Sequence, residues 1–508
     1  MNRPTVSLIA TVAALAAVAG FASLTEPEAS GPDTAAKTAT QMPVERTSLL
    51  CPGPSASDVA ETAYTSFTPV TEGAATNGRA ELAPVGEESA DGSESSDKKS
   101  GNSDSGDKEA AKKPVLTPKE PGEPVTGEVS GADAPALLGT AEGGFAPGWT
   151  VQQTTEVPSG TGRGLLGANC TAPDTEFWFA GVSTAEERTD YVHLTNPDDS
   201  AAVVDIELYG KDGSLKSASG EGIQVQPHST EPVLLSTLID EQQSDLTVHV
   251  TVRSGRVAAA AQALDDKLGG DWLAASADPA GSLVLPGIPK DATSVRLVAF
   301  TPGDLDADLK VQLASQSGLI TPAGNETLHV KAGMTAVADL GDVTRGEAGS
   351  LVLTPTEEAV PVVAGLRVVR GKGDKQETAF IPASRPVGTR ATVADNRAKG
   401  STLSVVAPAE AAEVKVTASA GSEGGTATSK TYKVKGGTTQ DIEAPVPSGL
   451  KGSYALTVEP VSGGPVYAAR TLEMPEGGIP RFTVQTLPDD RGMVAVPDAE
   501  QDLSVLQK

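Results

Sequence analysis

The amino-acid sequence predicts an all-β protein built from tandem antiparallel β-sandwich repeats of about 105 residues. The turn HLTNP, ending at Pro197, returns as AFTP at Pro302 and as VVAP at Pro408, at offsets of 105 and 106 residues. Two further landmarks keep nearly the same spacing: Val225, Val330 and Val434 form one series, and Val257, Val362 and Val466 form the other. Three landmarks in one register indicate that a single unit has been copied along the chain.

Within each copy, apolar and polar residues alternate over short segments. Residues 204–208 (VDIEL) and 246–252 (LTVHVTV) show the period of two that is typical of half-buried strands. Turn-forming residues such as Asn196 and Pro197 separate these segments. The pattern favours Ig-like sandwiches, which have about seven strands per 100 residues. The alternative is a closed β-propeller-like ring with two blades per copy, completed by the N-terminal strands and by residues 481–488.

The composition narrows the function classes. Among 508 residues, 67 are acidic and 39 are basic, so the formal net charge of −28 disfavours binding to nucleic acid or to an anionic membrane surface. Aromatic residues are only 3% of the chain, whereas glycine and proline number 54 and 37. Small aliphatic cores with many turns follow from this composition, and a deep aromatic-lined enzyme pocket is disfavoured.

The N-terminus carries an export segment. Arg3 precedes an uncharged run over residues 6–24, whose 19 residues just suffice to cross a bilayer. Ala17 and Ala19 also fit the small-residue pattern of a signal-peptide cleavage site. Residues 1–24 are therefore interpreted as a signal peptide or a membrane anchor. In either case the rest of the chain is expected outside the cytoplasm, secreted or anchored to the cell membrane by residues 6–24.

The remaining chain is divided by composition and by the repeat landmarks. Residues 25–46 read as a polar tether, and 47–80 as the leading strands of an incomplete first repeat, because TSLLCPGP and YTSFTP echo later segments. Residues 81–145 are expected to be a disordered acidic and Pro-rich insert, since they offer few large apolar side chains. Three β repeats are then predicted at 146–280, 281–377 and 378–490, and a loose tail at 491–508.

Cys51 and Cys170 are the only cysteines, and they flank the predicted insert. In an extracytoplasmic protein such a pair predicts a disulfide. Closing a loop of this length removes denatured-state entropy worth on the order of 5 kcal/mol in the chain-entropy model. A metal-binding or redox role is disfavoured because no CxxC spacing and no neighbouring histidine are present.

Motifs for other chemistry are incomplete. The four histidines show no i, i+2 or i, i+4 spacing, so no metal site is predicted. The acidic run at 304–308 resembles the start of a calcium loop, but Leu309 and Ser315 replace the glycine and glutamate that such a loop requires. The GxGxxG letters at 162–167 lack a βαβ context, and no GxSxG elbow occurs. We therefore predict no cofactor and no catalytic residues, although a hydrolase site assembled only by the fold stays an alternative.

Tryptophan is scarce enough for each one to be weighed. Trp178 and Trp272 are candidates for a glycan-binding surface, because sugars stack on exposed aromatic rings. The alternative, which we favour, is that both pack in the core at equivalent positions of adjacent copies.

The order of several short motifs resembles one protein family. After the leader come LCPGP at 50–54, the acidic insert, NC at 169–170 followed by FWFAGVST, the HLTNP turn, and GGDW at 269–272. This layout is similar to that of the actinobacterial secreted-protein family catalogued as domain of unknown function 5719. The resemblance implies an all-β envelope protein with no assigned activity and no established catalytic residues.

The expected function is that of a non-catalytic extracytoplasmic cell-envelope scaffold or interaction protein. Its partner would be a cell-envelope protein or glycan, and the membrane would be contacted only through the N-terminal segment. A cell-wall glycan-binding module is the alternative, and a hydrolase is the least favoured reading.

Overall fold

The computed structural model describes residues 40–86, 113–217 and 219–496. The chain divides into a large compact unit, Pro43–Met493, and a small one to which the described residues 40–42 and 494–496 belong. Strands β1 (Thr40–Pro43) and β37 (Met493–Val496) pair with each other, so the predicted tether and tail each contain a short strand. The predicted leader at 1–24, with its apolar helix, lies outside the described residues. Within the described ranges, no helix has the length and apolar character needed to cross a membrane.

The large unit consists of four copies of one strand pattern. Copy 1 comprises β2 (Arg46–Cys51), β3 (Glu61–Phe67), β4 (Gly78–Pro84), β5 (Val125–Ser130), β6 (Leu137–Gly143), β7 (Thr150–Val157) and β8 (Gly164–Asn169). Copy 2 comprises β9 (Glu176–Val182), β10 (Arg188–Asn196), β11 (Ala202–Gly210), β12 (Gly213–Leu215), β13 (Ile223–Val225), β14 (Ser229–Leu234), the short 3-10 helix η1 (Leu235–Thr237), β15 (Leu246–Ser254), β16 (Ala258–Asp265) and β17 (Gly269–Leu273).

The remaining two copies repeat this pattern. Copy 3 comprises β18 (Leu283–Ile288), β19 (Ala292–Phe300), β20 (Ala307–Ser315), β21 (Leu319–Ile320), β22 (Thr327–Val330), β23 (Thr335–Gly341), β24 (Gly349–Pro355), β25 (Val363–Lys372) and β26 (Lys375–Pro382). Copy 4 comprises β27 (Ala391–Asn396), β28 (Ser401–Ala407), β29 (Ala412–Gly421), β30 (Gly424–Thr426), β31 (Thr428–Val434), β32 (Thr438–Ile442), β33 (Ser448–Lys451), β34 (Tyr454–Gly463), β35 (Tyr467–Glu473) and β36 (Phe482–Thr486).

Each copy is a sandwich of two antiparallel sheets with a common strand order. The first sheets run β2-β6-β4, β9-β15-β11-β12, β18-β24-β20-β21 and β27-β34-β29-β31. The second sheets run β5-β3-β7-β8, β14-β10-β16-β17, β23-β19-β25-β26 and β32-β28-β35-β36. The tandem sandwiches are thus present, but this order differs from the ABED and CFG sheets of an immunoglobulin domain, so the Ig-like part of the prediction is not confirmed.

The sequence landmarks fall at equivalent places in these copies. Pro197, Pro302 and Pro408 each follow the second strand of their copy, namely β10, β19 and β28. The alternation of apolar and polar residues also marks half-buried strands as predicted, because Val204, Ile206 and Leu208 are buried between the sheets. Each copy has one such aliphatic core, and the turns connect equivalent strands.

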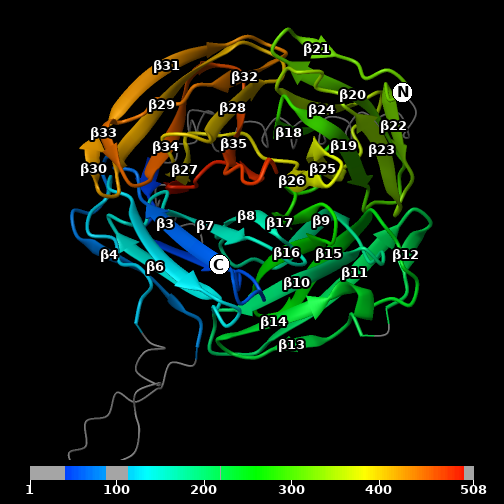
Figure 1. Ribbon diagram of the computed structural model, residues 1–508, viewed down its shortest axis with the longest axis horizontal. Coiled ribbons are helices and arrows are strands. Elements are labelled where there is room, and N and C mark those ends of the chain that lie inside the picture. The colour runs from blue at the N-terminus through cyan, green and yellow to red at the C-terminus, as the bar shows by residue number, and fades with distance from the viewer. Residues whose placement is uncertain (1–39, 87–112, 218, 497–508) are drawn as a thin grey trace, which may run out of the picture. The chain divides into compact units, whose positions relative to one another are not determined.

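The last strands of the four copies meet at the centre of the large unit. These strands, β8, β17, β26 and β36, are called the central strands; β8 contacts β17 and β36, and β26 contacts the same two, which closes a cycle. Figure 1 shows the copies following one another around them, from blue and cyan through green and yellow to orange. The first sheets continue the cycle, since β9 packs on β25, β18 on β35, and β27 on β7. The four sandwiches therefore close on one another, and the predicted propeller with two blades per copy is not confirmed.

Several predicted boundaries are wrong, and those at 80/81 and 377/378 fall inside β4 and β26. Residues 113–145, assigned to the insert, contain β5 and β6, which complete both sheets of copy 1. Strands β7 and β8, assigned to the next repeat, also belong to copy 1. The first repeat therefore has both of its sheets and is more complete than predicted. The misassignment arose because Leu116 and Leu137 are among the few large apolar residues that anchor residues 113–145 in the core.

Candidate functional site

A buried polar centre lies where the four central strands converge. Asp271 of β17 is fully buried, and its Oδ1 accepts hydrogen bonds from the backbone N–H groups of Gly167 (2.9 Å) and Trp272 (2.8 Å). The Thr483 hydroxyl of β36 donates to Oδ2 at 3.0 Å. One carboxyl group thus joins copies 1, 2 and 4. Burial raises the pKa of Asp271 well above its usual range, although these hydrogen bonds oppose the shift.

A second carboxyl group joins copies 1 and 3. Glu377 of β26 is fully buried, and its Oε1 accepts the backbone N–H of Leu165 in β8 at 2.9 Å. Its Oε2 lies 3.5 Å from Nη1 of Arg163. Arg163 also donates through Nη2 to the carbonyls of Lys267 (2.9 Å) and Gln376 (3.1 Å), which belong to copies 2 and 3. Burial raises the pKa of Glu377 to about 7, against the opposing effect of Leu165 and Arg163.

Close approach of the strands explains two glycines at this centre. A Cβ atom at Gly167 would lie 2.5 Å from the Thr483 side chain, and one at Gly164 would lie 2.6 Å from Oε1 of Glu377. Real Cβ contacts are longer, so β8 needs glycine at both places. The GxGxxG letters of the sequence therefore serve strand packing, and they do not precede a helix.

The junction between copies 4 and 1 is polar as well. Thr154 donates to Oδ2 of Asp395 at 2.7 Å, and the side-chain oxygen of Gln152 accepts the N–H of Ala394 at 2.6 Å. Arg470 is fully buried and donates to the carbonyl of Asp395 at 3.1 Å, and burial lowers its pKa to about 10. The bonds of Thr154 and Gln152 close the cycle between the last copy and the first, whereas the Arg470 bond supports Asp395 from within copy 4.

The polar centre suits structural roles better than catalysis. Buried carboxyl groups with raised pKa values are a feature of active sites, but also of structural networks. Asp271 and Glu377 are both fully buried; both oxygens of Asp271 and Oε1 of Glu377 accept hydrogen bonds from other copies, and Oε2 of Glu377 has only the ion pair with Arg163. A substrate therefore has no access to them in this conformation, and the geometry favours a role in joining the copies.

Replacing Glu377 with glutamine is expected to change how stability depends on pH. The folded-state pKa of about 7 exceeds the ordinary value of 4.5, so the folded protein binds more protons between these values and wild-type stability falls as pH rises through that window. Glutamine keeps an acceptor for Leu165 but does not titrate. Relative to wild type, E377Q should gain about 1 to 3 kcal/mol between pH 5 and pH 8, measured by urea unfolding at both values. E423Q, at an exposed position, controls for loss of a charge. A pH-independent difference would contradict the expectation.

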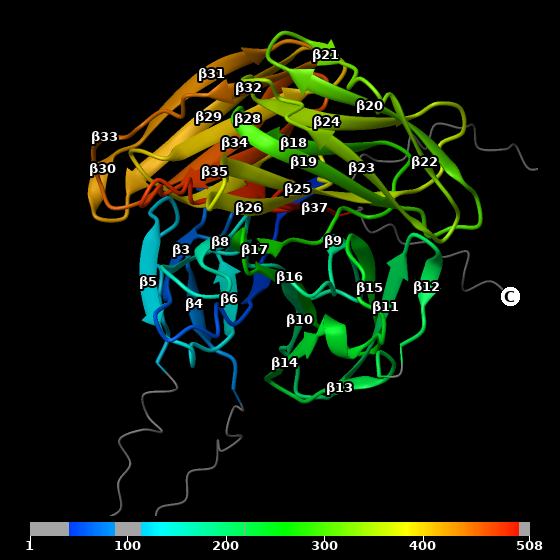
Figure 2. The same ribbon diagram turned by 45° about the vertical axis from the view of Figure 1, so that its right-hand side comes forward.

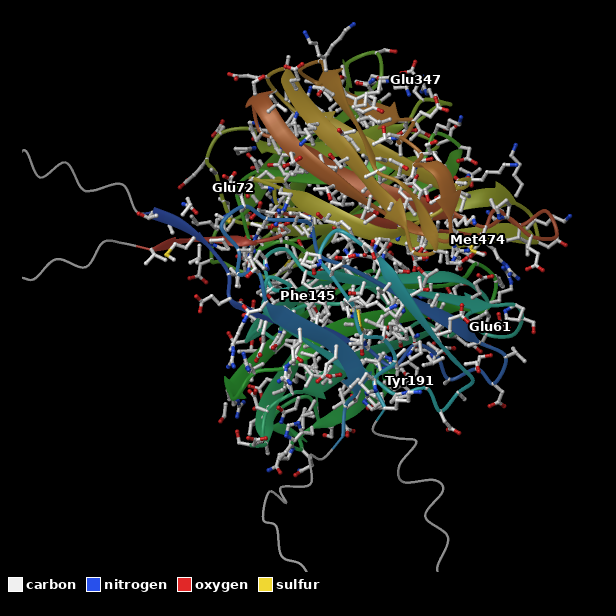
Figure 3. The ribbon with its side chains drawn as sticks, turned by 90° about the vertical axis from the view of Figure 1, so that its left-hand side faces the viewer. Glu61, Glu72, Phe145, Tyr191, Glu347 and Met474 are labelled. Carbon is white, nitrogen blue, oxygen red and sulfur yellow. A yellow bond between two sulfur atoms is a disulfide. The ribbon has the colours of Figure 1, made fainter. Side chains whose placement is uncertain are left out.

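The predicted disulfide is present. Cys51 at the end of β2 is bonded to Cys170, one residue after β8, with 4.4 Å between the Cα atoms (Figure 3). The bond links the two sheets of copy 1 across a sequence separation of 119 residues. Leu50 and Thr171 beside it exchange two backbone hydrogen bonds of 2.8 and 3.0 Å. The disulfide is therefore part of a local clamp on copy 1.

The two candidate glycan-binding tryptophans lie at junctions between copies. Trp178 is 5% exposed, stacks on His249 with ring centroids 3.7 Å apart, and packs on Phe300 of copy 3. Trp272 is 3% exposed and packs with residues of copy 1 such as Leu166. Neither ring presents an exposed face on which a sugar could stack, so core packing accounts for both. The expected equivalence between adjacent copies is wrong, because the two residues lie on β9 and β17 of the same copy.

The other polar candidates form surface pairs. His329 lies 2.8 Å from Asp308 and 3.4 Å from Asp306, so the acidic run pairs with a histidine of the neighbouring strand. His249 lies between Glu176 and Glu207 at 3.1 and 3.2 Å. Across the described ranges, no group of three or more His, Cys, Asp or Glu side chains is arranged to hold a metal ion.

Repeated antiparallel sandwiches joined by a buried polar centre define the class to which this chain belongs, an all-β repeat protein. Residues 125–445, more than half of the chain, match Family of unknown function (DUF5719), and the chain belongs to that family. The family membership inferred from the short motifs, in domain of unknown function 5719, is thereby confirmed. No curated protein and no solved structure is significantly similar to the chain.

Proposed function

We propose that the protein is a non-catalytic scaffold of the cell envelope, located outside the cytoplasm, that holds an anionic envelope polymer. The observation that carries the scaffold role is the cycle of four sandwiches (Figure 2). Buried polar side chains such as Glu377, Asp271 and Thr154 form hydrogen bonds between these copies. The location is supported by the Cys51–Cys170 disulfide, since disulfides persist mainly in oxidising compartments, and by the leader-like sequence at residues 6–24.

The surface best suited to such a partner is a basic depression in copy 3. It has a volume of about 820 Å³ and is lined by three exposed cations, Lys290, Arg345 and Lys372. Asp291 and Asp342 also line it; Asp291 is paired with Arg370 at 2.8 Å, whereas Asp342 is exposed. Three cations against two carboxylates leave a small local excess of positive charge in a chain with net charge −28, and this excess would attract a polyanion.

The backbone at Arg345 adds to this argument. Its φ angle is 46°, in the left-handed region that costs a side-chain-bearing residue about 1 kcal/mol or more. Gly346 follows with a φ angle of 90°. Strained residues cluster at functional sites, so the presence of an arginine in this backbone conformation supports a binding role for the depression.

Charge reversal at this surface is expected to weaken binding to isolated cell envelopes. The triple variant K290E/R345E/K372E should bind at least about tenfold less tightly than wild type, equivalent to about 1.4 kcal/mol, in a salt-dependent sedimentation assay. The matched control K211E/K331E/K433E makes the same charge change at exposed lysines elsewhere. Equal losses in both variants would overturn the assignment of the depression.

The same assay separates the partner classes and tests the location. Binding that survives protease treatment of the envelopes identifies a wall polymer, whereas binding lost on treatment identifies an acidic protein and contradicts the polymer. Fractionation of the producing cells should find the protein outside the cytoplasm with its cysteines oxidised. Recovery of reduced protein from the cytoplasm would overturn the proposed location.

A further inference from the structure

A second cavity lies between copies 1 and 2, beside the disulfide. Its volume is about 90 Å³. Leu50 and Pro52, on either side of Cys51, form part of one wall, and Phe177, His193 and Trp272 of copy 2 line the remainder with several alanines. The cavity is therefore mainly apolar, and both copies are needed to form it.

Two ring nitrogens at this cavity lack a hydrogen-bond partner. Nε1 of Trp272 is buried and unpaired, in a side chain that is only 3% exposed. Nε2 of His193 is likewise buried and unpaired. An unsatisfied buried donor costs roughly 1 to 3 kcal/mol, and such groups in native structures call for an explanation. The indole N–H of tryptophan is a donor only, so what it lacks is an acceptor.

The two rings are arranged as a pair. Their centroids lie 5.3 Å apart with an interplanar angle of 63°, an edge-to-face arrangement. Burial lowers the pKa of His193 to about 4, against the opposing effect of a hydrogen bond with Gln262, so the imidazole is neutral at physiological pH. The two rings therefore contribute two polar atoms, Nε1 of Trp272 and Nε2 of His193, and no charge to the cavity lining.

Size and chemistry together define a ligand. A site of this volume exceeds the space that one water molecule requires, about 10 to 15 Å³ on the same kind of measure. Its alanine, leucine and phenylalanine lining suits an apolar body, whereas the Trp272 N–H requires an oxygen or nitrogen acceptor. A charged ligand is disfavoured because none of the lining side chains is charged.

We propose that this cavity binds a small neutral molecule with a single-ring apolar body and one hydrogen-bond acceptor, of the phenol class, held by the Trp272 indole N–H and the His193 imidazole. The site is independent of the basic depression and does not rest on the scaffold role. The disulfide holds part of its wall, because Cys51 and Cys170 adjoin the lining residues Leu50, Pro52, Asn169 and Thr171.

Phenol is the probe that tests the proposal. Titration of the ¹⁵N-labelled protein should shift the Trp272 indole N–H signal downfield in a saturable manner, and the W272F spectrum assigns that signal. Benzene should bind several-fold more weakly, because it fills the cavity without accepting a strong hydrogen bond. In W272F the affinity for phenol, measured by calorimetry, should fall about fivefold, the equivalent of one hydrogen bond of about 1 kcal/mol.

W178F is the matched control. Trp178 is similarly buried at a junction between copies, but its Nε1 already donates to Glu176 at 3.1 Å and it does not line the cavity. W178F should bind phenol as wild type does, and thermal unfolding verifies that both variants fold. An unchanged Trp272 signal at millimolar phenol would overturn the proposal, as would equal affinities for phenol and benzene or equal affinities of folded W272F and wild type for phenol.

Discussion

Replacing Cys51 and Cys170 with alanine is expected to lower the free energy of unfolding by about 2 to 5 kcal/mol, the largest effect of any change considered for this protein. The bond closes a loop of 119 residues, so its removal returns conformational entropy to the unfolded chain. Both cysteines are also buried, and smaller side chains there would leave part of the core unfilled.

Urea unfolding of the double variant beside oxidised and reduced wild type measures this effect. Reduced wild type keeps both side chains, so it separates loss of the bond from loss of volume. The loss should be concentrated in copy 1, which hydrogen exchange of β2 and β8 would detect as weakened protection. Equal stability of all three forms would show that the bond contributes nothing to holding the two sheets together.

The substitution Asp271→Ala is expected to cost about 2 to 4 kcal/mol. It removes the acceptor for the N–H of Gly167 and for the hydroxyl of Thr483, leaving two buried donors unsatisfied in two other copies. Because these donors belong to copies 1 and 4, the damage should extend beyond the copy that carries the substitution.

Asp271→Asn provides the control. Asparagine retains an acceptor at the same place and cannot ionise, so the cost should be much smaller than that of alanine. At high pH the asparagine variant should approach or exceed wild-type stability, because burial of a carboxylate penalises the folded wild type there. If alanine were tolerated as well as asparagine, the hydrogen bonds of Asp271 would not be what joins the copies.

The repeat architecture could be predicted from the sequence because short segments carry its landmarks. Pro197, Pro302 and Pro408 mark one turn in three copies, and the alternation around Ile206 marks the strand that follows it. Both signals arise from the geometry of a half-buried strand and its turn, which a short segment encodes by itself. The disulfide was also accessible, since only one pairing of two cysteines exists.

The strand order and the polar centre were beyond such reasoning. Pairings between β3 and β7 or between β10 and β16 join segments far apart in the chain, and no short pattern specifies them. Asp271 lies in the GGDW segment of β17, which resembles a family motif but indicates no chemistry by itself, and Glu377 lies on β26 in no motif. One feature of the sequence could have pointed to these residues. A carboxylate within an otherwise apolar or glycine-rich strand raises the free energy of the folded state unless the fold supplies hydrogen-bond partners for it.

The copies differ at the centre, and there is a physical reason for the difference. Asp271 in copy 2 corresponds to Ala379 in copy 3 and to Thr483 in copy 4, when each is placed by its partner on the preceding strand. Four carboxylates converging here would repel one another, and four large side chains would not fit. Repeat detection relies on similarity, so it fails at the residues that allow the copies to meet.

The closed cycle also bears on how the polypeptide acquires its structure during synthesis. Phe67, in the first copy, packs with Ala394 and Ala455, which are made more than three hundred residues later. Until that last quarter emerges, the earliest sandwich keeps an apolar flank exposed to water and to other nascent chains. The first copy can therefore complete its packing only near the end of translation. Premature termination upstream of Ala394 would leave a product prone to self-association.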